Sequence, residues 1–152
     1  MRLVFAFFTA VAVTYVLAVL CYTQLNIANL IEMGVDITIE VRLTPTIHEM
    51  LGMSEVYFPI LVVFLLIAYG LAGFFAAVLK ELRVLFFVMA GLLVPSTIDF
   101  LLTFSWWGLN IVQDTHPIAV TRTTAGLLSQ SAACAIGSLL FCSMIGPTEA
   151  NR

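Results

Sequence analysis

The stretch VYFPILVVFLLIAYGLAGFFAAVL at residues 56–79 decides the fold, because it runs for 24 positions without a charged side chain. A helix needs about 20 mainly apolar residues to cross about 30 Å of hydrocarbon. The stretch therefore predicts a transmembrane helix. Its small residues Ala68, Ala72 and Ala76 recur at every fourth position, and such a row lets a neighbouring helix approach closely.

The composition of the whole chain indicates the same class of protein. Of its 152 residues, 62% are hydrophobic and 10% are charged, and the mean hydropathy is +1.10, whereas a soluble domain is about 25% charged. The formal charge is −3 and basic residues do not cluster, so nucleic acid is not an expected partner. The three cysteines, Cys21, Cys134 and Cys142, lie in apolar stretches without a CxxC pair, which favours packing residues over a disulfide framework.

Further apolar stretches predict three more spans, at residues 3–23, 84–107 and 118–145. The first is too long for the hydrophobic core of a signal peptide and has no small-residue cleavage site, so we expect it to remain as a helix. The sequence thus predicts a single domain, residues 1–152, folded as an all-α, four-helix transmembrane bundle. Two more rows of small residues favour close helix packing: Ala6, Ala10, Thr14 and Ala18, and Ala125, Ser129, Ala133 and Gly137.

The polar region at residues 24–55 predicts a small cap on the outer face of the bundle. Residues 24–33 suit a short interfacial helix. Residues 35–43 alternate strictly between apolar and polar side chains, many of them β-branched, which predicts a half-buried strand. A lone strand leaves both edges unpaired, so this one would lie against the bundle or pair with another subunit. Pro45 then suits the first position of a second short helix that ends before Gly52.

The distribution of basic residues predicts the orientation. With four spans, most of the bases fall on one side of the membrane, and that side is expected to be cytoplasmic, together with both termini. These bases are Arg2, Lys80, Arg83 and Arg152. The loops at residues 24–55 and 108–117 would then face the outer side. The short chain and compact loops favour a bacterial inner membrane, with the outer side being the periplasm.

Two charges inside the predicted spans form the strongest candidate site. Asp99 in the third span and Arg122 in the fourth lie at similar distances from the loop that joins them. Because an unpaired charge in hydrocarbon costs several kcal/mol, we expect the two to meet. A fixed ion pair that locks the two helices together is the simplest interpretation. The functional alternatives are a proton-linked carboxylate, an anion site on Arg122, or a contact with the buried charge of a partner.

Other polar residues surround this pair. Pro95 removes a backbone hydrogen bond in the middle of its span and predicts a kink, directly followed by Ser96 and Thr97. Gln130 lies deeper in the fourth span, on the same broad face as Arg122. We expect it to join helices by hydrogen bonds, to Thr97, to a carbonyl at the kink or to its own copy in another protomer.

The outer side carries the remaining candidates. Trp106 and Trp107 end the third span and are expected to anchor it at the membrane interface. His48 and His116 are weak candidates for a copper or zinc site, because the sequence contains no HxxxH or HExxH spacing. Accordingly, the sequence predicts no catalytic residues, no resident metal and no cofactor.

Three functions fit these features. The first is a non-catalytic accessory or structural subunit. It would contact the surrounding membrane lipids and assemble with other membrane proteins or with its own copies. Small-residue helix faces and the outer loop would form the contacts. The alternative is a small transporter, channel or lipid-binding protein that uses Asp99 and Arg122. A second alternative is a membrane enzyme with an outer-face metal site.

Overall fold

The computed structural model describes residues 1–35, 39–103 and 123–146, and it is helical throughout these ranges apart from short connections. The elements are α1 (Arg2–Glu32), α2 (Ile39–Gly52), α3 (Tyr57–Val78), the 3-10 turn η1 (Lys80–Leu82), α4 (Arg83–Thr103) and α5 (Thr124–Ile145). Helices α1, α3, α4 and α5 are long and apolar enough to cross a membrane. The predicted all-helical architecture with four candidate spans is therefore confirmed.

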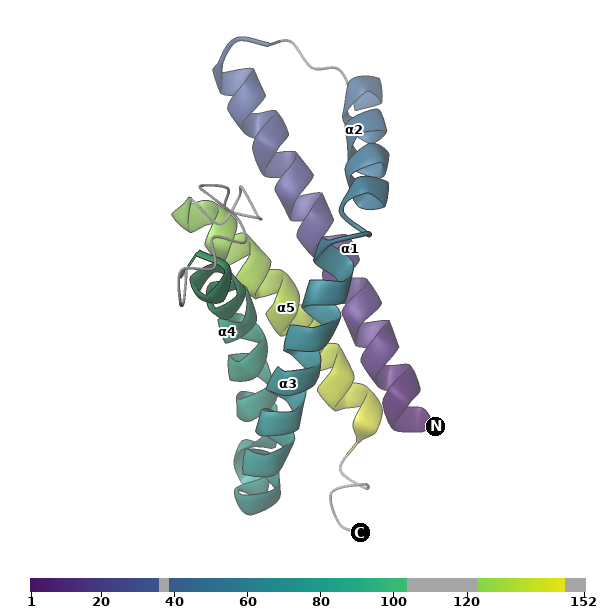
Figure 1. Ribbon diagram of the computed structural model, residues 1–152, viewed down its shortest axis with the longest axis vertical. Coiled ribbons are helices and arrows are strands. Elements are labelled where there is room, and N and C mark those ends of the chain that lie inside the picture. Colours follow the sequence, from purple (N-terminus) through teal and green to yellow (C-terminus); the bar gives the residue numbers. More distant parts are fainter. Residues whose placement is uncertain (36–38, 104–122, 147–152) are drawn as a thin grey trace.

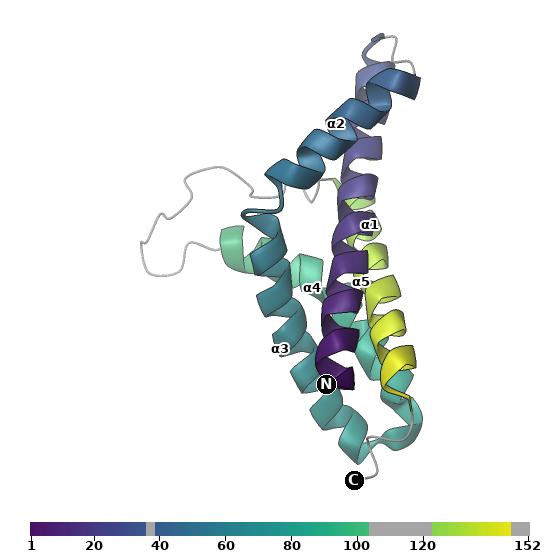
Figure 2. The same ribbon diagram turned by 90° about the vertical axis from the view of Figure 1, so that its right-hand side faces the viewer.

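Helix α5 is the centre of the bundle. It packs along α4 on one side and along α1 on the other, while α3 packs mainly against α4. Figures 1 and 2 show α1 and α5 running side by side, and in Figure 1 α3 crosses in front of α5 while α4 lies on its other side. The start of α1, the turn between α3 and α4 and the end of α5 all lie at one end, and α2 lies at the opposite end (Figures 1 and 2).

Helix α1 is longer than a membrane is thick. Its 31 residues rise about 46 Å at 1.5 Å each, against about 30 Å of hydrocarbon. It ends at Glu32, and the positive φ of 87° at Gly34 allows the N–H of Gly34 to bond the Ile31 carbonyl and that of Val35 to bond the Leu30 carbonyl. The separate interfacial helix predicted at residues 24–33 is therefore wrong. No glycine or proline interrupts these residues, so they continue α1.

The strand predicted at residues 35–43 is also wrong where the structure describes it. Residues 39–43 form the first turns of α2, and residues 36–38 lie outside the described ranges. A helix satisfies its own backbone hydrogen bonds, whereas this strand had no partner. Helix α2 starts six residues before Pro45, which lies inside it, and it ends at Gly52 as expected.

The row of small residues on α1 is the surface that meets α5. Ala6, Ala10, Thr14 and Ala18 are all at most 1% exposed. Opposite them lies Gly137, where an added Cβ would come 1.8 Å from Thr14 Oγ1 and 3.0 Å from the Ala10 carbonyl oxygen. The predicted close-packing role of this row is confirmed, and the partner helix lies within the same chain.

A second glycine brings α4 equally close to the other side of α5. A Cβ at Gly91 would lie 2.2 Å from Ser138 Oγ and 2.7 Å from the Cys134 carbonyl oxygen. Ser138 and Cys134 are themselves fully buried. Backbone therefore lies against small side chains on both sides of α5, which is the usual basis of helix association in lipid.

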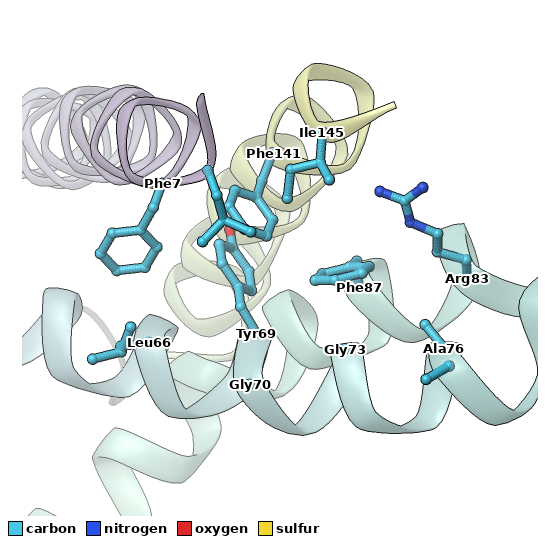
Figure 3. Close-up of a pocket in the computed structure, with 12 residues that line it drawn as sticks. Phe7, Leu66, Tyr69, Gly70, Gly73, Ala76, Arg83, Phe87, Phe141 and Ile145 are labelled. Carbon is cyan, nitrogen blue, oxygen red and sulfur yellow. The ribbon is translucent and has the colours of Figure 1, made fainter. Parts of the chain in front are cut away.

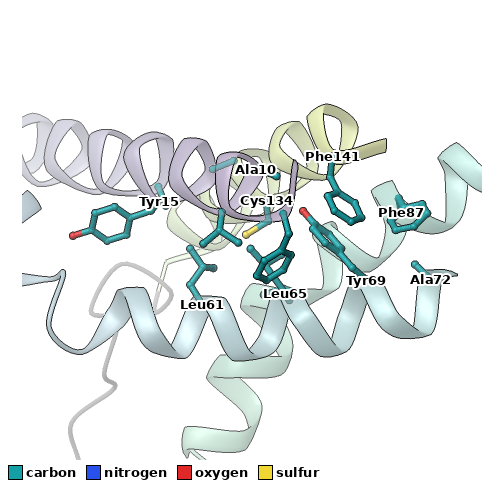
Figure 4. Close-up of a cluster of buried hydrophobic side chains, with 14 of the residues drawn as sticks. Ala10, Tyr15, Leu61, Leu65, Tyr69, Ala72, Phe87, Cys134 and Phe141 are labelled. Carbon is teal, nitrogen blue, oxygen red and sulfur yellow. The ribbon is translucent and has the colours of Figure 1, made fainter. Parts of the chain in front are cut away.

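Helix α3 is held away from α1 by large aromatic side chains. Tyr69 of α3 stacks on Phe141 of α5 with ring centroids 4.4 Å apart, and it meets Phe7 of α1 edge to face at 6.1 Å. Phe87 of α4 completes this cluster, 5.5 Å from Phe141. Figure 4 shows Tyr69 and Phe141 pointing toward each other from α3 and α5, with Phe87 beside them. Large aromatic side chains lie between α1 and α3, whereas small residues lie between α1 and α5. For this reason α5, and not α3, is the close neighbour of α1.

The glycine contact gives the first testable prediction. Replacing Gly137 with alanine should destabilise the bundle by about 1–3 kcal/mol, because overpacking forces the helices apart. Thermal unfolding of the purified protein in one detergent measures the change. Gly70→Ala is the matched control, since a Cβ at Gly70 meets nothing within 4 Å.

A double variant tests whether the clash is with Thr14. Thr14→Ala removes the oxygen that would lie 1.8 Å from the new Cβ, so Thr14→Ala with Gly137→Ala should recover part of the lost stability. Equal melting temperatures for Gly137→Ala, Gly70→Ala and the unmodified chain would contradict the packing described here.

Candidate functional site

The predicted intramembrane polar site is only partly within the described residues. Asp99 is half-buried on α4, and Pro95 is buried inside the same helix. Arg122 lies outside the described residues, so its pairing with Asp99 stays a prediction. Thr97 donates a hydrogen bond to the Leu93 carbonyl at 2.8 Å, one turn back in its own helix. Ser96 is half-buried beside it.

Gln130 makes the principal polar contact of the bundle interior. Its side chain is 1% exposed. Its Oε1 accepts from the Tyr57 hydroxyl at 3.0 Å, and its Nε2 donates to the Ala18 carbonyl at 2.9 Å. One amide therefore joins α3, α5 and α1 within the chain. The expectation that Gln130 joins helices is confirmed, but its partners are Tyr57 and Ala18 rather than Thr97.

A second polar contact lies deeper in the bundle. The hydroxyls of Ser138 and Tyr69 are hydrogen-bonded at 3.1 Å, and Ser138 also donates to the Cys134 carbonyl at 2.8 Å. Both residues are buried. Like Gln130, these groups are satisfied inside the protein, which is what a membrane interior requires of polar atoms.

Helix α2 is attached to α1 through its polar side. Thr23 of α1 donates to Glu49 Oε2 at 2.6 Å, and Tyr15 of α1 donates to the Met50 carbonyl. Arg42 is half-buried on the same side of α2, and its Nε atom has no hydrogen-bond partner among the described residues. Arg42 and Glu49 of α2 are therefore turned toward the bundle.

The opposite side of α2 is apolar and exposed. Leu43, Ile47 and Leu51 recur every four residues and are 62%, 58% and 68% exposed. Residues four apart share one face of a helix, so the three form a continuous row. This orientation is the reverse of an ordinary amphipathic helix, which buries its apolar face and exposes its charges.

Two apolar cavities lie along the bundle. The first, of about 430 Å³, is lined by α1, α3, α4 and α5 and is shown in Figure 3. Arg83 lies at one end of it, and a guanidinium N–H of Arg83 donates to the Gly146 carbonyl that follows α5. The second, of about 420 Å³, is an apolar groove between α3 and α4. Asp99 and Gln130 line neither cavity.

The outer-face candidates give little further information. His48 is exposed on α2, beside the apolar row. His116, Trp106 and Trp107 lie outside the described residues, so their predicted roles as metal ligand and interfacial anchors stay predictions. Within residues 1–35, 39–103 and 123–146, no group of three histidine, cysteine or acidic side chains is placed to hold a metal ion.

The fold and these contacts define an all-helical membrane protein with four candidate spans and a satisfied polar interior. Comparisons with protein-family models, curated proteins and solved structures found no match.

Three features of the structure do not follow from the patterns used above. Tyr57 lies in an apolar span, and only the need of a tyrosine in hydrocarbon for a hydrogen-bond partner signals its contact with Gln130. The four-residue spacing of Leu43, Ile47 and Leu51 is a helical signal that competes with the alternation ending at residue 43. Arg83 lines a cavity, whereas its position in the sequence indicates only orientation.

The Gln130 contact gives the second prediction. Gln130→Met keeps the volume but leaves the Tyr57 hydroxyl and the Ala18 carbonyl without this partner, so it should lower stability by about 1 kcal/mol. Tyr57→Phe should cost less, and the double variant should fall short of the sum. Unfolding in detergent measures all three. Ser129→Ala is the control, because within the described residues its hydroxyl bonds only the Gly126 carbonyl of its own helix. Losses no larger than that of the control would contradict the role of Gln130.

Proposed function

We propose that this chain is a non-catalytic subunit of a membrane protein assembly. In this proposal it binds a partner membrane protein or a second copy of itself through the exposed apolar row of α2, formed by Leu43, Ile47 and Leu51. That row is the observation that carries the proposal. It lies at the end of the molecule away from the start of α1 and the end of α5, where α1 extends beyond the bundle (Figure 2).

The burial pattern of α2 supports a contact on its outer side. Its charged residues Arg42 and Glu49 face the bundle, whereas its apolar row faces away. Removing apolar surface from water is favourable by about 25 cal/mol per Å². The apolar side chains on that side are therefore favoured to meet another apolar surface. The exposed row is thus an expected binding surface of the kind that marks protein or membrane contacts.

The bundle interior supports a structural rather than a transport role. The helices are in close contact at Gly137 and Gly91, and the buried polar groups Gln130 and Ser138 are already hydrogen-bonded inside the chain. A transport pathway needs polar groups that a passing solute can reach. Neither of the two cavities is lined by Gln130, Ser138 or Asp99.

The test is a charge placed in the middle of the row. Ile47→Glu should lower the fraction of the chain in its complex at least about tenfold, because a carboxylate would be buried in an apolar contact. Native mass spectrometry after mild-detergent extraction from the native membrane measures that fraction. His48→Glu adds the same charge on the neighbouring exposed position and should have a smaller effect.

Two outcomes would contradict the proposal. One is a wild-type chain that is monomeric under these conditions. The other is a complex that survives Ile47→Glu as well as it survives His48→Glu, with the bundle still folded. A monomer whose α2 binds protein-free lipid vesicles less well after Ile47→Glu would instead assign the row to the membrane surface.

The transporter or channel alternative depends on Asp99 and Arg122. If it holds, Asp99→Asn should abolish flux in reconstituted vesicles while the protein still folds. On the subunit proposal, wild-type vesicles show no flux above protein-free vesicles, and Asp99→Asn changes nothing. Flux that depends on the Asp99 carboxylate would favour the alternative.

A further inference from the structure

The cavity at the terminal end of the bundle has one charged residue in an otherwise largely apolar lining. Its walls include Leu66, Phe87, Phe141 and Ile145, and Arg83 lies at one end of it (Figure 3). At about 430 Å³ it is within the range of about 300–1,000 Å³ typical of small-molecule sites. An apolar lining with a single cation at one end suits an amphiphile with one anionic group.

The cavity exists because α3 carries glycines at this level. Gly70 and Gly73 both line it, and a Cβ at either position would meet nothing within 4 Å. Leu3 and Leu66, also in the lining, are 51% and 59% exposed, so the cavity opens at the surface of the bundle. In a membrane, that surface faces lipid chains.

The length of the cavity matches one leaflet of a bilayer. Its lining on α3 runs from Leu66 to Ala77, which corresponds to about 16 Å at 1.5 Å per residue. This is about half of the 30 Å hydrocarbon thickness. Arg83, just beyond the η1 turn, lies where the lipid phosphates of that leaflet are expected.

The position of Arg83 suits a phosphate group. Its guanidinium is half-buried and held by the Gly146 carbonyl, which uses one of its five N–H donors. The planar fork of a guanidinium matches the oxygens of a phosphate. Arg2 and Lys80 are exposed at the same end of the bundle and add positive potential, while the acidic Glu81 of η1 is exposed and outside the cavity lining.

From these features we propose that the cavity binds one acyl chain of an anionic phospholipid, with the lipid phosphate on Arg83. The acyl chain fills the part of the cavity beside Gly70 and Gly73. This site is independent of the α2 surface at the other end of the molecule, so the two proposals fail or succeed separately.

Native mass spectrometry with added lipid tests the proposal. The delipidated protein in detergent is mixed with phosphatidylglycerol or phosphatidylcholine, and bound lipid is counted. The wild-type chain should retain one phosphatidylglycerol, with a preference of about fivefold over phosphatidylcholine, as expected for one cation near a lipid phosphate. Millimolar inorganic phosphate should not displace the lipid, because the acyl chain supplies most of the contact. Displacement by phosphate, or no retained lipid, would overturn the proposal.

Gly73→Leu tests whether the acyl chain lies in the cavity. The new side chain occupies the cavity without a backbone clash, so binding of both lipids should fall about tenfold. Ala132→Leu, at an exposed position of α5 outside the lining, is the matched control and should bind lipid as the wild type does. Equal lipid retention by Gly73→Leu and the control would overturn the site.

Arg83→Gln tests the headgroup contact. It should weaken binding of phosphatidylglycerol by about fivefold and binding of phosphatidylcholine less, because the phosphate of phosphatidylcholine is already paired with its own trimethylammonium group, so the preference for phosphatidylglycerol falls. Arg83→Lys keeps the charge but loses the fork, and it should keep most of the preference, which separates charge from any effect of losing the bond to Gly146. An unchanged preference in Arg83→Gln would overturn the assignment of the phosphate to Arg83.

Discussion

At Gly137, helix α5 comes so close to α1 that a Cβ in place of the glycine hydrogen would lie 1.8 Å from the Thr14 hydroxyl oxygen. Apolar side chains gain nothing from leaving lipid, so membrane helices associate through such close backbone packing and through buried hydrogen bonds. Both are present along α5. The hydrogen bond from Gln130 to the Ala18 carbonyl lies two turns along the same contact, and it sets the register of the two helices.

The remaining features follow from the position of α5. With α1 and α4 close on either side, α3 completes the bundle through the large rings of Tyr69 and its neighbours, which keep it away from α1. Where α3 carries glycines instead of large side chains, that separation becomes the cavity near Arg83. At the other end, α1 extends beyond the bundle and supports α2. The two ends of the molecule thus offer different surfaces, one suited to lipid and one to a protein partner.

The four spans and the role of the α1 small-residue row could be predicted from the sequence, because length, apolarity and four-residue spacing are local properties. The partners of Gln130 could not, since they depend on the register between helices that are distant in sequence. The strand prediction is wrong at residues 39–43, where the structure describes a helix, because alternation in a short segment is ambiguous between an exposed helix and a half-buried strand. Asp99 was correctly placed on a span, but its proposed partner Arg122 lies outside the described residues.

The most direct test of the account is disulfide cross-linking of α1 to α5 in native membranes. In a chain with Cys21, Cys134 and Cys142 replaced by alanine, Thr14→Cys and Gly137→Cys bring two thiols together. The ideal Cβ at position 137 lies 3.1 Å from the Thr14 Cβ, and the small helix separation that the new Cβ forces brings this distance to about 3.5–4.5 Å, as in a disulfide. The close packing of α1 on α5 predicts rapid oxidation to a disulfide within one chain. Mass spectrometry of the linked peptides identifies that disulfide. No disulfide, or one that joins two chains into a dimer, would contradict it by showing that this face of α5 belongs to another contact.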